Sequence, residues 1–78
     1  MITPPQIRAA RALLGWRQAD LANASGISEV AIKNIERGQT DPKATTLTAI
    51  QGAFLKAGVI FLDPNDPRNG GHGVRFKK

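Results

Sequence analysis

The stretch Arg17–Gly38 reads RQADLANASGISEVAIKNIERG and contains two short helical patterns, residues 17–24 and 28–37. Gly26 separates them, because a chain that leaves a helix can take a positive φ at glycine without a Cβ clash. Ser28 can cap the second helix by accepting a hydrogen bond from a backbone N–H. Helices of about two turns are unstable alone. We therefore expect a surrounding core to hold them at a fixed angle.

The second helical pattern has two different faces. Ile32 and Ile35 lie on the face predicted to be buried. The opposite face carries a mixed set of residues that is free to contact a partner: Glu29, Val30, Lys33, Asn34 and Arg37.

This stretch resembles the helix-turn-helix of the phage repressor and Cro family, the XRE-like DNA-binding domains. The resemblance covers about residues 7–59 and does not extend to the tail from Ile60 onward. It rests on small, apolar and polar residues at the expected spacing: Gln18, Leu21, Ala22, Gly26, Ile27, Ser28, Ile32, Ile35, Glu36, Arg37, Gly38 and Pro42. It implies a mainly α, four- or five-helix lambda-repressor-like domain.

The resemblance also implies how the chain would contact DNA, with helix 28–37 in a major groove. Glu29 would accept a hydrogen bond from a cytosine amino group, and Lys33 would donate to guanine. Asn34 would pair with adenine, and Val30 would touch a thymine methyl group. The expected contacts to the DNA backbone are Arg17, Gln18, Ser28, Arg37, Gln39 and Thr40.

Two positions near the start of helix 17–24 bear on this expectation. Arg17 departs from the family, which usually has Thr or Ser there as a cap, and a lost cap costs ~1 kcal/mol. Asp20 can partly compensate by facing the positive helix end. Gln18 corresponds to the family glutamine that contacts the DNA backbone and braces the recognition helix. The loop 38–43 either meets a phosphate or is a solvated turn.

The flanking segments predict two more helices. Thr3 and Gln6 form a capping-box pattern at the start of helix 3–14. Asp41 and Pro42 look like the cap and first residue of a helix that runs to residue 57. Within it, Gly52 costs ~1 kcal/mol relative to alanine and could permit tight packing. Trp16 is expected in the core, the alternative being a stacking contact with DNA bases.

Residues 59–78 differ in character from the helical domain of residues 1–58. Residues 59–62 and 74–77 predict a short C-terminal β-hairpin across a turn or loop. A lone hairpin is marginal in water, so it must pack on the helices, pair with a second copy or stay partly disordered. The tail also carries positive charge, either as a DNA-backbone arm or as a solvated edge that discourages aggregation. Those residues are Arg68, Arg75, Lys77 and Lys78.

Composition narrows the classes of function. The 78 residues predict one small domain, and the net charge of +5 with a pI near 10.5 suggests a polyanionic partner. The absence of cysteine fits a reducing compartment. No apolar run approaches the ~20 residues that span a bilayer, and the N-terminus does not resemble a signal peptide; we expect a cytoplasmic protein without membrane contact. His72 is the single histidine and has no ligand cluster. We expect neither metal, cofactor nor enzymatic activity.

Two functions remain from the sequence. The first is a sequence-specific DNA-binding transcriptional regulator, repressor-like, that acts as a homodimer on double-stranded DNA. The alternative is an antitoxin or adaptor-type module that uses the same fold to bind a toxin or other protein partner. The expected homodimer includes pairing of the hairpin with a second copy, motivated by its apolar strand and by the edge that a two-stranded ribbon leaves unpaired.

Overall fold

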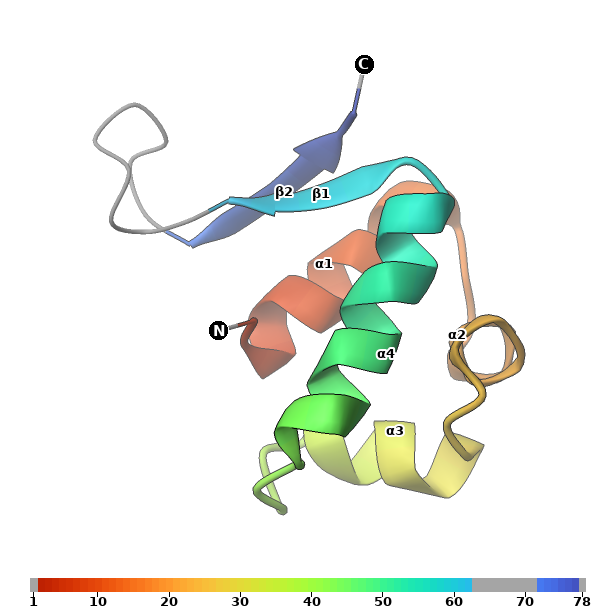
Figure 1. Ribbon diagram of the computed structural model, residues 1–78, viewed down its shortest axis with the longest axis vertical. Coiled ribbons are helices and arrows are strands. Elements are labelled where there is room, and N and C mark those ends of the chain that lie inside the picture. Colours follow the sequence, from red (N-terminus) through yellow and green to blue (C-terminus); the bar gives the residue numbers. More distant parts are fainter. Residues whose placement is uncertain (1, 63–71, 78) are drawn as a thin grey trace.

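The computed structural model describes residues 2–62 and 72–77. Within them the chain forms four helices followed by two antiparallel strands: α1 (Pro4–Leu14), α2 (Gln18–Ser25), α3 (Glu29–Glu36), α4 (Ala44–Lys56), β1 (Val59–Leu62) and β2 (Gly73–Phe76). The molecule measures 35 × 25 × 18 Å. Figure 1 shows the hairpin at one end of the long axis and α3 at the other, with α1 and α4 between them. None of the described helices is long and apolar enough to cross a membrane.

Local capping fixes the starts of α1 and α3 as the sequence predicts. The Thr3 N–H donates to Oε1 of Gln6 at 2.9 Å, and the Gln6 N–H donates to Oγ1 of Thr3 at 3.4 Å, which completes the capping box. At α3, Oγ of Ser28 accepts from the N–H of Ala31 at 3.1 Å. Each cap satisfies a backbone donor that the first helical turn leaves unpaired.

The core lies between the inward faces of the four helices, and the hairpin covers it at the end away from α3. Its largest fully buried side chains are Phe54, Ile7, Leu21, Ile32, Ile50 and Val59. The ring of Trp16 stacks on Phe54 with centroids 5.6 Å apart, and Phe61 packs on the same ring at 5.7 Å. Trp16 therefore belongs to the core, as predicted.

The hairpin packs on helices of its own chain. Val59 is fully buried, and Phe61 and Val74, which are cross-strand partners, pack against the core. The side chain of Gln6 donates from Nε2 to the carbonyl oxygens of Gly73 at 3.0 Å and of Leu62 at 3.5 Å, which ties α1 to both strands. The second strand begins and ends one residue before the predicted range. Burial of the apolar strand thus needs no second copy, which removes one of our two reasons for expecting the hairpin to pair with one; the unpaired strand edge remains.

Helix α4 begins later than the sequence predicts. Asp41 and Pro42 precede the helix, and the N-cap position is Lys43, whose side chain makes no capping bond. Pro42 is half-buried and lines a cleft with Ile2 and Leu47. Lys43 keeps an extended backbone, with φ −65° and ψ 153°, so the local capping pattern of Asp41 and Pro42 does not set the start of the helix.

Gly52 has no packing role in α4. It is exposed, and a Cβ built on it would meet no atom within 4 Å. The prediction of tight packing at this position is wrong, and the glycine only adds conformational freedom to the unfolded chain.

We therefore expect Gly52→Ala to raise the free energy of unfolding by about 0.5–1 kcal/mol, because alanine is the better helix former. Gly58→Ala is the matched control. Gly58 has φ +95°, so the same Cβ should cost stability there. Denaturant unfolding of both variants checks this. A loss of stability in Gly52→Ala would contradict it.

Candidate nucleic-acid interface

A tight turn joins α2 to α3. Gly26 takes φ +77°, and its N–H donates to the carbonyl of Ala22 at 2.9 Å. The hydroxyl of Ser25 donates to the carbonyl of Leu21 at 2.7 Å and accepts from the N–H of Ile27 at 3.2 Å. These bonds satisfy the backbone groups at the turn and fix the direction in which α3 departs.

The start of α2 is capped from Asp20. Arg17 occupies the N-cap position and its side chain makes no capping hydrogen bond. The Asp20 carboxylate instead accepts from the Arg17 N–H at 2.8 Å and lies 3.6 Å from the Arg17 guanidinium. The predicted compensation by Asp20 is confirmed, and the exposed Arg17 side chain extends into solvent at this end of the helix.

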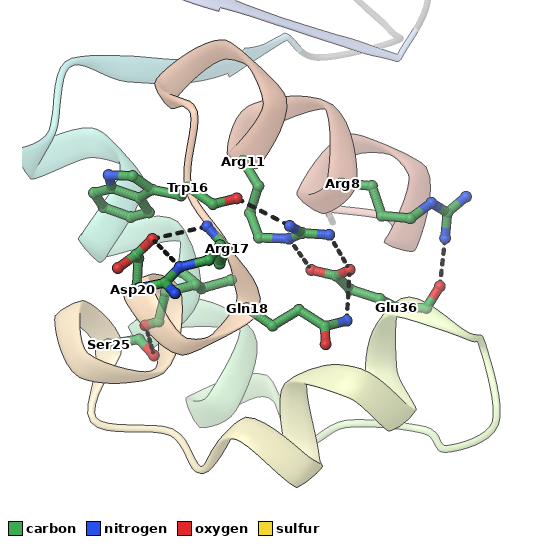
Figure 2. A network of polar contacts seen from close by, with 9 residues as sticks. Arg8, Arg11, Trp16, Arg17, Gln18, Asp20, Ser25 and Glu36 are labelled. Atoms are coloured by element: carbon green, nitrogen blue, oxygen red, sulfur yellow. Dashed lines mark hydrogen bonds and ion pairs between the residues drawn. The ribbon is translucent and has the colours of Figure 1, made fainter.

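A buried carboxylate connects three helices (Figure 2). Glu36, the last residue of α3, is only 4% exposed. Arg11 of α1 binds it through two hydrogen bonds, Nε to Oε2 at 2.6 Å and Nη2 to Oε1 at 2.7 Å. Gln18 of α2 donates from Nε2 to Oε1 at 3.2 Å. The prediction that Gln18 braces helix 28–37, which is α3, agrees with this geometry.

Two further contacts complete the network. Nη1 of Arg11 donates to the carbonyl of Trp16 at 3.0 Å, in the segment between α1 and α2. Nη1 of Arg8 donates to the backbone carbonyl of Glu36, where the last carbonyls of α3 lack helical partners. A cation at this helix end also suits the helix dipole.

The Arg11 guanidinium keeps its positive charge throughout the neutral range. The hydrogen bond to Glu36 raises the pKa of Arg11 above its ordinary value, although partial burial lowers it. A base with a raised pKa stabilises the fold below that pKa and loses this contribution only as pH rises through it. The contribution of Arg11 to stability is therefore independent of pH in the neutral range.

The structure places the predicted base-contacting residues on the outward side of α3. Glu29, Val30 and Lys33 are exposed, Val30 to 69%, and Asn34 is half-buried. The ion pairs of residues 2–62 and 72–77 are Arg11–Glu36 and Arg17–Asp20, so the charges of α3's outward face are unpaired within this part of the chain.

The predicted backbone-contacting residues frame α3. Gln39 and Thr40 are exposed in the loop after it, and Ser28 and Arg37 lie at its two ends. Arg17 and Gln18 begin α2, and the Gln18 side chain reaches the last residue of α3. The sequence did not identify Arg11 as the partner of Glu36 or Arg8 as a cap of α3.

The charged tail does not share this surface. Arg75 and Lys77 are exposed in the hairpin, which lies at the opposite end of the molecule from α3 (Figure 1). Arg68 and Lys78 lie outside the described residues. The arrangement does not support these hairpin cations as an arm for the same DNA that α3 would contact.

Comparisons with known proteins agree with the geometry. A family model described as helix-turn-helix matches residues 7–54. Among solved structures, the solution structure of the DNA-binding domain of the P22 C2 repressor is 38% identical. The match covers 70% of this chain and 72% of that chain, with a TM-score of 0.63. A search of curated proteins finds no match.

The network predicts a large difference between two arginine variants. Arg11→Met leaves the buried carboxylate of Glu36 without its counter-charge and should lower the free energy of unfolding by about 3–5 kcal/mol. Arg17→Met removes an equal charge from an exposed pair and should cost less than about 1 kcal/mol. Denaturant unfolding measures both. Similar losses in the two variants would contradict the assigned role of Arg11.

Proposed function

Because this chain belongs to the repressor-type (XRE-like) helix-turn-helix family of DNA-binding regulators, we propose that it is a sequence-specific transcriptional regulator, repressor-like, that reads the major groove with α3. The observation that carries this proposal is the pairing of an exposed, mixed polar face on α3 with a buried network that fixes the helix to α1 and α2. A rigid helix of this kind can present its side chains to base edges in a constant register.

Base reading is assigned to the middle of the outward face. A major groove accepts an α-helix and offers a distinct donor and acceptor pattern for each base pair. Asn34 suits adenine through its amide, Lys33 can donate to guanine, and Glu29 can accept from cytosine. The exposed methyl groups of Val30 suit the methyl group of thymine.

Phosphate contacts are assigned to residues at the start of α2, at the two ends of α3 and in the loop that follows α3. Arg17 and Gln18 lie at the start of α2, where the unpaired N–H groups and the helix dipole favour an anion. Because Gln18 also binds Glu36, a phosphate held there would be fixed relative to α3. Ser28, Arg37, Gln39 and Thr40 would hold the strands on either side of the helix. These contacts set the register without reading sequence.

The two classes of contact should separate by mutation. Asn34→Ala should cost about 1–3 kcal/mol of binding free energy on the best site and much less on unrelated DNA, because it removes a base contact. Arg37→Ala should weaken binding to all sequences alike. It should also flatten the plot of log K against log salt, by about 0.9 for one lost phosphate contact. Competition assays at several salt concentrations, on a selected duplex and a scrambled one, measure both effects.

Ile35→Ala is the control for loss of folding. This side chain is buried, so its truncation should cost about 2–5 kcal/mol of stability and reduce binding only as the domain unfolds. If Asn34→Ala stayed folded and lost affinity equally on both duplexes, α3 would be misassigned as the base-reading element.

We expect two copies of the chain on each operator. One short helix reads too few base pairs to discriminate against the competing sites of a genome. Two copies related by a two-fold axis would read half-sites roughly 34 Å apart, so the operator should be an imperfect palindrome. Footprinting of a selected duplex, combined with the mass of the complex from light scattering, tests this. One copy on a single asymmetric half-site would refute it.

A further inference from the structure

Exposed large apolar side chains occur at both ends of the molecule. Val30 belongs to the face of α3 already assigned to DNA. Leu55 is 50% exposed in the last turn of α4, and Phe76 is 45% exposed at the end of β2. The N–H of Lys77 donates to the carbonyl of Gly58 at 2.7 Å, which holds the end of β2 against the segment that follows α4. The last turn of α4 and the end of β2 therefore both lie at the hairpin end of the molecule (Figure 1).

The same end is positively charged. Lys56 is the last residue of α4, and Arg75 and Lys77 flank Phe76 in sequence. None of the three forms an ion pair within residues 2–62 and 72–77. The carboxylates of that part of the chain are Asp20, Glu29, Glu36 and Asp41, none of which belongs to α4 or the hairpin. We call Arg75, Phe76 and Lys77 the distal corner.

An unpaired strand edge runs along the distal corner. Because hydrogen-bonded and non-bonded pairs alternate in an antiparallel ladder, the bond from Lys77 to Gly58 implies that the backbone groups of Val74 and Phe76 point away from β1. Neither residue has a backbone partner outside the hairpin in the described part of the chain. The guanidinium of Arg75 donates to the Phe76 carbonyl at 3.0 Å, which places this cation directly on the edge.

We propose that the distal corner binds an acidic, partly apolar segment of another protein, laid in extended form along β2. The backbone of such a segment can pair with the free edge, as in strand addition to a sheet. Its carboxylates would face Arg75 and Lys77, and its apolar side chains would cover Phe76. Charge complementarity and the open edge are the features that select this partner.

The same features disfavour a second copy of the chain at this corner. Antiparallel pairing of two β2 edges centred on Arg75 places Arg75 opposite its own copy. Pairing centred on Phe76 places Arg75 opposite Lys77 of the other copy. Like charges directly opposite one another destabilise a strand pair.

A DNA duplex is also a poor fit. The corner lies at the end of the 35 Å long axis away from α3, so DNA bound to α3 does not reach it. Large aliphatic and aromatic side chains between cations are typical of protein interfaces rather than of phosphate contacts.

The test uses the full chain and a fluorescein-labelled peptide, Asp-Phe-Glu-Leu-Asp-Val-Glu, in fluorescence anisotropy at low salt. Lys77→Glu should weaken peptide binding by about five- to tenfold, because it reverses a charge that faces the carboxylates. Lys33→Glu is the matched control, with the same charge change on an exposed residue of α3, and should leave peptide binding within about twofold. On a selected DNA duplex, Lys33→Glu should weaken binding more than Lys77→Glu does. A failure of the peptide proposal is therefore separable from a failure of the proposed DNA function.

A second variant tests the apolar part of the corner without touching the core. Phe76→Ser should weaken peptide binding about threefold or more, as expected for an anchor at an interface, and a thermal unfolding curve shows whether the variant stays folded.

Four results would overturn the proposal. They are absence of peptide binding, equal losses from Lys77→Glu and Lys33→Glu, equal binding of a peptide with lysine in place of the acidic residues, and displacement of the peptide by scrambled duplex DNA. Conversion of a dimer to a monomer by Phe76→Ser, seen by light scattering, would likewise overturn it by showing that a second copy occupies the corner.

Discussion

The orientation of α3 depends on the buried carboxylate of Glu36. An eight-residue helix has little stability of its own, so tertiary contacts decide where it lies. Arg11 binds both carboxylate oxygens from α1, and Gln18 binds one of them from α2. A buried ion pair contributes little net stability relative to an apolar pair of equal volume, because both charges lose hydration. Its value here is geometric: the paired oxygens and the planar guanidinium admit one relative position of α1 and α3.

The structure divides the surface into two ends with different chemistry. At one end, α3 and the start of α2 present polar and charged groups with few internal partners. At the other end, the hairpin covers the core with Val59 and leaves a basic edge with exposed apolar residues. Gln6 fixes that second end, because its amide joins the first turn of α1 to both strands. The two ends are therefore connected through α1, which carries both Gln6 and Arg11.

Features set by neighbouring residues were predictable from the sequence. The capping box of Thr3 and Gln6 and the cap at Ser28 join groups three residues apart, and the turn at Gly26 needs only a positive φ. Contacts between distant residues were not predictable. Arg11 and Glu36 are 25 residues apart, and Gln6 and Gly73 are 67 apart, so no local pattern marks them as partners.

The predicted start of α4 was wrong. Asp41 and Pro42 are a good local cap, yet the helix begins at Ala44, after a half-buried Pro42. For the candidate site, the outward face of α3 followed from helical periodicity alone. The network that holds this face in place was visible only in three dimensions.

We propose that DNA binds one end of the molecule, around α3, and that α1 fixes this end without contacting bases. A duplex selected from random sequence and titrated into isotopically labelled protein tests the claim by NMR. We predict that the amide chemical shifts that change most belong to α3, the start of α2 and the loop 38–43. Those of the hairpin should change little. The largest changes in the hairpin, with α3 unaffected, would contradict it.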